Sequence, residues 1–304
     1  MDISIVGAHN TQFGAFVKRD RETGEVEDLK SFYELIIEAG AGAIADAGLE
    51  AKDIDAVWLG SCSPSMFVNQ EHVAPLALEI DPDGLLYKPT TRTEGACATS
   101  SVAIYNAAYA VASGRFKNVL ALGVEKMSLL DTKGVTHALA CSSYWPEEGS
   151  MGVTFPGLFG ELAKAYQAKH GMSDEELRIM FAHIAAQNYR NGIHNPLAHF
   201  GPGSLPDKKQ LVTADAILDL PDSGKGSNPL IAPPLRLHDC SLISDGAAAV
   251  VLTSTENAKA NFNHAVELSG IGHVTQRMMM SERKETLHEL QAAKHAVQQA
   301  CTEA

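Results

Sequence analysis

The feature that most constrains the fold is an alternation of short apolar strands with helices in the first part of the chain. Ile3 to Gly7, Ala56 to Gly60 and Val119 to Gly123 are apolar runs that each end in glycine. Phe32 to Ala47, followed by Gly48, and Val73 to Ile80 have helical patterns between them. Because crossover helices of this length join parallel strands, the pattern predicts an α/β fold. We expect a largely parallel sheet covered on both faces.

The stretch from about Ser128 to His238 differs in composition from the rest of the chain, since it is rich in Pro, Asn, His and aromatic residues. We expect one long amphipathic helix after Ser173, which forms a capping-box pattern with Glu176. Regular structure resumes at Asp245 to Leu252, which is a predicted strand of small residues. The expected domains are residues 1–127 with 239–256, an insertion over residues 128–238 laid on the sheet, and a further segment over residues 257–304.

Composition excludes several classes of partner. The chain has 304 residues and a formal net charge of -13, with no Lys/Arg run that could neutralise a series of phosphates, which argues against nucleic-acid binding. No apolar run reaches the roughly 18 residues needed to span a bilayer, and no signal peptide is recognisable, so we expect a cytoplasmic protein without a membrane partner. The five cysteines are scattered without a C-x-x-C pair, which predicts free thiols and no metal or redox cofactor.

Cys97 is the candidate reactive residue. It lies in Thr93 to Ser101, a run of small residues between an extended stretch and an Ala-rich helical pattern that continues to Gly114. This places Cys97 at or next to a helix N-terminus, where unpaired N–H groups and the positive end of the dipole favour the nucleophilic thiolate. The alternative interpretation is a small buried cysteine within the helix.

A second strand–helix pair is predicted near the end of the chain. Val266 to Gly270 is strand-like and ends in glycine, as Ile3 to Gly7 does, and Thr286 to Ala304 has a helical pattern. The two helices match at four positions, which pair Ala39 with Ala296, Ala43 with Ala300, Asp46 with Glu303 and Ala47 with Ala304. Either the chain contains an internal repeat or two Ala-rich helices are similar by chance.

A series of short segments occurs in one order along essentially the whole chain. They are Val6-Gly7, Thr11 to Gly14, Glu94 to Ser100, Gly114-Arg115, Gly123 to Met127, Met151 to Gly157, Asn188 to Gly192 with Asn195-Pro196, Asp239 to Ser241 and Ser244 to Leu252. Together they resemble the thiolase superfamily, and within it the branch of sterol-carrier-protein-type thiolases and archaeal acetyl-CoA acetyltransferases. Several segments in one order are more specific than any single one.

The resemblance implies a duplicated βαβαβαββ fold with five layers in the order αβαβα. Residues 1–127 and 239–256 would then form the N-terminal thiolase half, and residues 128–238 would be the loop domain that contacts coenzyme A. Residues 257–304 would begin a C-terminal half that is incomplete in this chain. No cofactor is implied, because the coenzyme A thioester is itself the substrate.

The resemblance also implies roles for individual residues. Cys97 would be the nucleophile that takes the acyl group from acyl-CoA, and its backbone N–H would contribute to an oxyanion hole. Ser241 would lie beside the pantetheine arm. Met151 would line the pocket, and Ser150 stands where some relatives carry a histidine.

Some positions depart from the family pattern or invite a second interpretation. His238-Asp239-Cys240 has the residue types of a catalytic motif of this branch, but Ser241 follows at once, so we interpret His238 as structural. We also expect polar loop contacts from His183, His194 and His199 of the insertion. Glu94 stands where many relatives have Asn, and Ser100 stands where most have Gly.

The implied activity is acyl transfer between coenzyme A thioesters, as 3-ketoacyl-CoA thiolysis or Claisen condensation. Thiolases also use a His-containing motif and a second cysteine near a Gly-His-Pro segment, and this sequence stops before either. We therefore expect a fragment that performs carbon–carbon chemistry poorly by itself. Two alternatives stay open: a non-catalytic acyl-CoA-binding or scaffolding subunit, and a retro-aldolase of steroid side-chain CoA esters that works with a small partner protein. The expected partners are acyl-CoA and a second copy of the chain.

Overall fold

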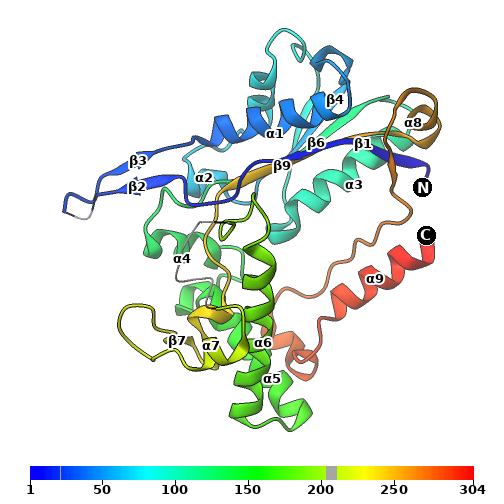
Figure 1. Ribbon diagram of the computed structural model, residues 1–304. Helices are drawn as coiled ribbons and strands as arrows, with labels where there is room; N and C mark the ends of the chain where they lie inside the picture. Colours follow the sequence, from blue (N-terminus) through cyan, green and yellow to red (C-terminus); the bar gives the residue numbers. More distant parts are fainter. Residues whose placement is uncertain (21, 203–210) are drawn as a thin grey trace. The chain divides into compact units, whose positions relative to one another are not determined.

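The computed structural model describes residues 1–20, 22–202 and 211–304. They form two compact units (Figure 1). Unit 1 comprises Met1–Asp131, Ser244–His273 and Ala296–Ala304, and unit 2 comprises Thr132–Ile243 and Val274–His295. The chain thus leaves unit 1 after Asp131 and returns at Ser244, whereas the domain division predicted at 127/128 and 238/239 stays a prediction.

Unit 1 is built around a six-stranded sheet with the order β10-β1-β9-β6-β4-β5. Its strands are β1 (Ile3–Asn10), β4 (Ala56–Gly60), β5 (Thr90–Thr93), β6 (Val119–Glu125), β9 (Gly246–Ser254) and β10 (Val266–Glu267). A separate hairpin consists of β2 (Val17–Arg19) and β3 (Val26–Asp28). The α/β class and the predicted strands of the sequence are confirmed.

The expectation of a largely parallel sheet is wrong. β4 pairs in parallel with β5 and β6, but the pairs β6–β9, β9–β1 and β1–β10 are antiparallel. The pairings place β1, β4, β5 and β6 in one direction, as crossover helices require. The chain returns to unit 1 just before β9, which lies between β1 and β6 and runs in the opposite direction to both. The two pairs that β9 forms are therefore antiparallel.

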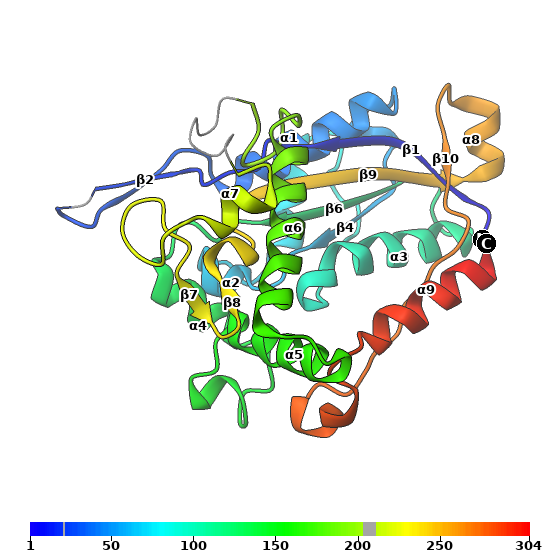
Figure 2. The same cartoon turned by 60° about the horizontal axis from the view of Figure 1, so that its bottom comes forward.

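Both faces of the sheet are covered by helices of unit 1 (Figure 2). The helical elements of this unit are α1 (Phe32–Asp46), η1 (Ala51–Asp53), α2 (Pro64–Phe67), η2 (Ala74–Ile80), η3 (Ala96–Ala98), α3 (Thr99–Ala112) and α8 (Thr255–Asn261). Leu120 and Leu122 of β6 join the core cluster that contains α1, whereas Val119 and Ala121 join the cluster that contains α3. This period of two confirms a sheet buried on both sides.

Local sequence accounts for the ends of α1. Ser31 Oγ accepts a hydrogen bond from Glu34 N, and the Glu34 carboxylate accepts one from Ser31 N at 2.7 Å, which completes a capping box. Gly48 follows the helix with a φ of 68°, as expected of a C-terminal glycine. Ala74–Ile80 is a 3-10 helix instead of the α-helix expected from Val73, with Pro75 in its first turn.

The C-terminal strand–helix pair lies partly in unit 1 and repeats two contacts of the first pair. Helix α9 (Gln291–Glu303) begins later than the expected Thr286, because Met280–Thr286 forms the 3-10 helix η7. A Cβ added at Gly7 would lie 2.4 Å from Ala43 O, and one at Gly270 would lie 2.1 Å from Ala300 O. The matched alanines of the two helices therefore meet equivalent glycines.

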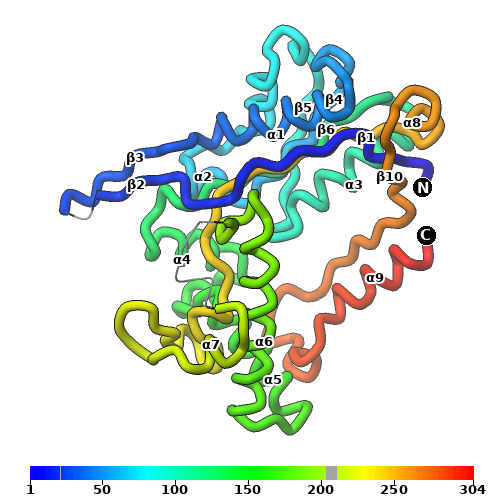
Figure 3. Tube along the Cα trace, viewed as in Figure 1, coloured from blue at the N-terminus to red at the C-terminus, as the bar shows by residue number. Residues whose placement is uncertain are grey.

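The second repeated contact is a hydrogen bond to a helix carboxylate. Ala8 N donates to Asp46 Oδ2 at 2.9 Å, and Ile271 N donates to Glu303 Oε2 at 2.9 Å. The two ends of the chain also lie side by side in unit 1 (Figure 3), where the Met1 amino group is 3.7 Å from Glu303 Oε1. Agreement in both contacts favours the internal repeat over chance similarity.

Unit 2 is mainly helical. Its elements are α4 (Thr132–Ala140), η4 (Gly149–Met151), α5 (Phe155–His170), α6 (Asp174–Gly192), α7 (Ala214–Leu218), β7 (Leu230–Ala232), β8 (Leu235–Arg236) and η6 (Leu237–Asp239), with η7. The capping box of Ser173 and Glu176 at the start of α6 is confirmed. The sequence predicted one long helix here, but α5 is a second one, capped by Thr154 and ended by Gly171. No helix among the described residues is long and apolar enough to cross a bilayer.

Candidate functional site

Cys97 lies in a one-turn 3-10 helix, η3, that links the end of β5 to the start of α3. Its side chain is exposed, which does not fit the alternative of a buried structural cysteine. β4, β5 and β6 are parallel, so their carboxyl ends meet at the edge of the sheet where this turn begins. The prediction that Cys97 is next to a helix N-terminus is confirmed, because α3 begins at Thr99.

The backbone of this turn is held by its own side chains. Ala96 adopts a left-handed conformation with a φ of 48°, which costs a non-glycine residue about 1 kcal/mol or more. Thr99 Oγ1 accepts a hydrogen bond from Gly95 N at 2.9 Å and donates one to Ala96 O at 2.6 Å. The Glu94 carboxylate accepts a hydrogen bond from Ala96 N at 2.5 Å. Glu94, which departs from the family pattern, therefore fixes the residue before the cysteine.

Two glycines let the first turn of α3 lie directly on the sheet. Gly60 ends β4 and is paired with Gly123 of β6. A Cβ at Gly60 would lie 2.9 Å from Thr99 Cγ2, and one at Gly123 would lie 1.9 Å from Ser100 Oγ. Neither strand could carry a larger residue here unless the turn moved away, so these glycines set the height of Cys97 above the sheet.

The backbone N–H of Cys97 belongs to the first turn of its helix. The first N–H groups of a helix have no acceptor within the helix, and they point toward its N-terminal end. Such a group can donate to an oxygen that becomes negative when a nearby sulfur attacks a carbonyl carbon. The oxyanion role of Cys97 N fits this position and stays a prediction.

A half-buried carboxylate at the same edge of the sheet was not predicted from the sequence. Glu125 at the end of β6 accepts hydrogen bonds from Cys62 N at 2.7 Å and Ser61 Oγ at 3.2 Å. Burial raises the pKa of Glu125 above its ordinary value, while these bonds and the Arg92 guanidinium act in the opposite direction. Arg92 also donates to the Ser61 and Cys62 carbonyls. Glu125 and Arg92 both hold the loop after β4. The only part of the sequence pattern that included Glu125 was the segment Gly123 to Met127 of the family resemblance.

The other predicted site residues belong to unit 2. Ser150 and Met151 are neighbours in η4, where Ser150 Oγ donates to Pro146 O at 2.9 Å and Met151 is 75% exposed. Ser241 is exposed and follows η6. The structure therefore brings Ser150 and Met151 together and places Cys97 on a different unit. The proposed contacts of Ser150, Met151 and Ser241 with coenzyme A stay predictions.

His238 has partners within unit 2 that suit a structural role. Its Nδ1 lies 2.8 Å from Tyr189 Oη, and its backbone N donates to Asn228 Oδ1 at 3.0 Å. Burial raises the pKa of Tyr189 to about 12, so the phenol stays protonated. Burial also raises the pKa values of Asp239 and Cys240. These contacts agree with the structural interpretation of His238.

Metal ligation finds no support in the part of the chain that the structure describes. No group of three or more His, Cys, Asp or Glu side chains is placed there to hold an ion. The expectation that no cofactor is needed stays a prediction.

The sheet of unit 1 thus presents an exposed cysteine between a strand end and a helix, and comparison with known proteins shows the family. A family model described as "Thiolase, N-terminal domain" matches residues 3–256. The acetyl-CoA acetyltransferase of Methanothermobacter thermautotrophicus is 35% identical over 284 residues, which cover 93% of this chain and 65% of that protein. That of Methanocaldococcus jannaschii is 36% identical over 301 residues, which cover 98% and 68%. The chain belongs to the thiolase family and spans about two thirds of the length of these relatives.

More distant relatives confirm the predicted branch and fold. Human sterol carrier protein 2 is 25% identical over 239 residues, which cover 75% of this chain and 38% of that protein. The solved structure titled "Ltp2-ChsH2(DUF35) aldolase" has a TM-score of 0.70 at 20% identity. The match covers 99% of this chain and 69% of the aldolase chain. A monomeric SCP2-thiolase-like protein of Mycobacterium smegmatis has a TM-score of 0.67 at 18% identity, with 100% and 56% covered. The likeness to the solved structures concerns the fold, which is thiolase-like.

Proposed function

We propose that this chain takes part in thiolase-type acyl transfer between coenzyme A thioesters, with Cys97 as the nucleophile. The observation that carries the proposal is the exposed Cys97 in a strained turn at the carboxyl ends of the parallel strands. Such a position gives the sulfur access to a bound thioester and offers it backbone N–H donors.

The chemistry required of Cys97 is one thioester exchange, in which the acyl group moves from the coenzyme A sulfur to the Cys97 sulfur. The Cys97 thiolate attacks the acyl carbonyl carbon, and a carbon–sulfur bond forms while the carbonyl oxygen takes up negative charge. The bond from that carbon to the coenzyme A sulfur then breaks, and the leaving thiolate takes the proton that Cys97 had lost. The Cys97 N–H donates to the oxyanion in the intermediate. Thiolysis or condensation needs a further base for the α-carbon, which the family resemblance assigns to the C-terminal half.

The proposed substrate is acetyl-CoA, after the name that the two archaeal relatives share. We also propose that Ser241, Met151 and Ser150 contact this substrate. The proposal includes a second copy of the chain, since β5 is an edge strand of the sheet with one side open to pairing. A small partner protein is the alternative, because the solved aldolase is titled as an Ltp2-ChsH2(DUF35) assembly. Light scattering after size-exclusion chromatography distinguishes a dimer of this chain from a complex with a small partner.

We further propose that the activity is located in the cytoplasm.

Intact-mass spectrometry after incubation with acetyl-CoA tests the proposal. We expect one acetyl group on each wild-type chain and none on Cys97→Ala. Cys301→Ala is the matched control, because Cys301 is also an exposed thiol of unit 1, and it should be acetylated like the wild type. An adduct that persists in Cys97→Ala, or the absence of an adduct on the wild type, would contradict the assignment.

A further inference from the structure

The backbone pairing of β4 stops where the loop after this strand begins. Gly60 is the last residue of β4 in register with its neighbours, which are Thr93 of β5 on one side and Gly123 of β6 on the other. The chain then turns away through residues 61–63, and Ser61 is buried. The polar backbone groups of this loop therefore need partners other than a neighbouring strand.

Two charged side chains from the neighbouring strands supply these partners. Arg92 of β5 donates from Nε to Ser61 O at 3.3 Å and from Nη2 to Cys62 O at 3.2 Å. Glu125 of β6 accepts hydrogen bonds from Cys62 N at 2.7 Å and from Ser61 Oγ at 3.2 Å. Ser63 N also donates to Glu125, at 3.5 Å. We call Arg92, Glu125 and their contacts with this loop the strand-end clamp.

Glu125 lies on the face of the sheet that carries the Cys97 turn. Along β6, Ala121 belongs to the core cluster that contains α3, and a Cβ at Gly123 would collide with Ser100 in the first turn of α3. Because side chains alternate along a strand, Glu125 is the next residue on that face. Its carboxylate is therefore directed to the side of the sheet on which α3 begins, just beyond the contact of Gly123 with the helix.

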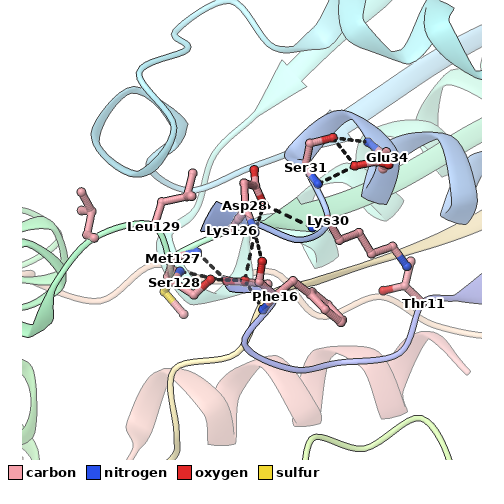
Figure 4. Close-up of polar contacts among 12 residues, drawn as sticks. Thr11, Phe16, Asp28, Lys30, Ser31, Glu34, Lys126, Met127, Ser128 and Leu129 are labelled. Carbon is pink, nitrogen blue, oxygen red and sulfur yellow. Dashed lines mark hydrogen bonds and ion pairs between the residues drawn. The ribbon is translucent and has the colours of Figure 1, made fainter. Parts of the chain in front are cut away.

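The residue after Glu125 fixes this end of β6. Lys126 is fully buried, and its Nζ lies 3.0 Å from Asp28 Oδ1 and 3.3 Å from Asp245 Oδ2. Figure 4 shows Asp28, the last residue of β3, directed toward Lys126. A buried charge that loses its partner is strongly unfavourable, so these ion pairs favour one position for the end of the strand. The Glu125 carboxylate thus comes from a fixed backbone.

The strand-end clamp joins the ends of the three strands that determine where Cys97 lies. Arg92 belongs to β5, which leads directly into the Cys97 turn, and Glu125 belongs to β6. The loop that they bind follows Gly60 of β4, and a Cβ at Gly60 would collide with Thr99 of α3. A shift of any of these strand ends would therefore move the first turn of α3 and the cysteine before it. Since the pairing of β4 ends at Gly60, restraint beyond it comes from the clamp.

We propose that Arg92 and Glu125 are positioning residues for Cys97, which keep its sulfur and the backbone N–H groups of its turn in the arrangement that acyl transfer requires. The inference rests on the proposed function, because it assumes that Cys97 is acylated. Neither residue touches substrate in this account, since both act through the loop after β4. Misplacement of a reacting group by about 1 Å can slow a reaction about a hundredfold, so even a small shift of the turn should be measurable.

Asp55 offers a matched control at the opposite ends of the same strands. Its Oδ2 accepts hydrogen bonds from Lys117 N at 2.6 Å and Asn118 N at 3.0 Å, just before β6 begins. Like Glu125, it is a carboxylate that binds two successive backbone N–H groups beside the parallel strands. It precedes β4, however, and so lies at the amino ends of these strands, away from the Cys97 turn. Asp55→Asn should therefore destabilise unit 1 without changing acyl transfer by the folded protein.

The experiment compares Glu125→Gln, Arg92→Lys and Asp55→Asn in the full chain. Exchange of labelled coenzyme A into acetyl-CoA should be about tenfold slower in Glu125→Gln, because a neutral amide binds the loop N–H groups less well. The loss should be smaller in Arg92→Lys, which keeps the charge but not the planar fork. Asp55→Asn should exchange at the wild-type rate.

Alkylation by iodoacetamide is the readout that a loss of folding or exposure would change. The rate at Cys97, followed by peptide mass spectrometry, should stay within about twofold of wild type in all three variants, because the thiol is exposed and this reaction needs no oriented N–H donors. A fall in alkylation as large as the fall in exchange would overturn the inference. So would wild-type exchange in both clamp variants, or an equal loss of exchange in Asp55→Asn and Glu125→Gln.

Amide hydrogen exchange separates failure of this inference from failure of the proposed function. If the wild type exchanges no coenzyme A although it binds acetyl-CoA, the proposed function fails, and the amides still test the strand-end clamp. We expect faster amide exchange at residues 95–99 in Glu125→Gln and Arg92→Lys than in the wild type or Asp55→Asn, because the turn is less restrained. Unchanged protection there in both clamp variants would contradict the positioning role even without activity. Arg92→Lys keeps the test valid if Glu125→Gln does not fold.

Discussion

The first and the last helix of the chain make the same contacts with the segment that precedes each of them but differ in burial. Gly7 approaches Ala43 O of α1 as Gly270 approaches Ala300 O of α9. α1 buries seven residues, whereas α9 buries none, and Val297 is 62% exposed. α1 also packs on η2, β6 and β9. Local sequence therefore specifies how a helix contacts the segment before it, while burial depends on neighbours from elsewhere in the chain.

The largest expected difference concerns apolar side chains of the two helices. Leu35 in α1 is fully buried, so Leu35→Ala should lower the free energy of unfolding by about 2–5 kcal/mol through lost burial and a cavity. Val297→Ala in α9 should change it by less than about 0.5 kcal/mol. Urea unfolding followed by circular dichroism measures both. A large loss in Val297→Ala would contradict the difference in burial between the two helices, because it would mean that α9 is buried in solution.

The paired glycines give a smaller effect. Gly7→Ala places a Cβ 2.4 Å from a helix carbonyl oxygen and should destabilise unit 1 by about 1–3 kcal/mol. Gly270→Ala makes an equally close approach, but it should release α9 locally, since no residue of α9 is buried. Hydrogen exchange should accelerate at residues 296–304 while the global free energy of unfolding changes little. Equal global losses in the two variants would show that both helices belong to one cooperative unit.

The paired carboxylates of the two helices should each contribute a small amount to stability. Asp46→Asn and Glu303→Gln each weaken one hydrogen bond from a backbone N–H, which is exposed for Ala8 and part-buried for Ile271. Each should cost about 1 kcal/mol or less, because a single hydrogen bond contributes little net stability. Exchange protection of the Ala8 and Ile271 amides reports the two bonds separately. Loss of protection at Ile271 in Asp46→Asn would contradict the independence of the two pairs.

The smallest expected effect is a pH dependence at Glu125, a carboxylate that is half-buried where Asp46 and Glu303 are exposed. Burial raises the pKa of Glu125 in the folded state, so the folded protein binds this proton more tightly than the unfolded chain. Its contribution to stability is therefore present at low pH and is lost as the pH rises through the folded pKa. Relative to Glu125→Gln, the wild type should be more stable near pH 4 than at pH 7. Urea midpoints at both pH values measure this difference, and the opposite sign would show that the hydrogen bonds outweigh burial.

Local patterns predicted most elements of unit 1 because their signals lie within a few residues. The strand at Ala56–Gly60 agrees with the sequence at both ends, and the capping box at Ser173 is where its spacing placed it. The direction of β9 could not be predicted, because apolar periodicity is the same for parallel and antiparallel pairing. Helix α5 was missed in a segment whose composition suggested loops.

The candidate site was predictable only in part for a related reason. The exposed turn at Cys97 followed from small residues next to a helical pattern, but the left-handed Ala96 is fixed by Glu94 and Thr99 through contacts that spacing does not reveal. The pair of Asp245 and Lys126 joins residues 119 positions apart, and no local rule connects them. Sequence therefore located the exposed turn of the candidate nucleophile, and the contacts that hold this turn came from the structure.

The proposed function requires that Cys97 accept an acyl group and return it. The most direct measurement is the exchange of isotopically labelled coenzyme A into acetyl-CoA, which requires transfer onto the enzyme and back and needs no carbon–carbon chemistry. We predict exchange that depends on the wild-type chain and disappears in Cys97→Ala, while Cys301→Ala retains it. Exchange that persists without Cys97, or no exchange in a folded wild-type chain that binds acetyl-CoA, would contradict the claim.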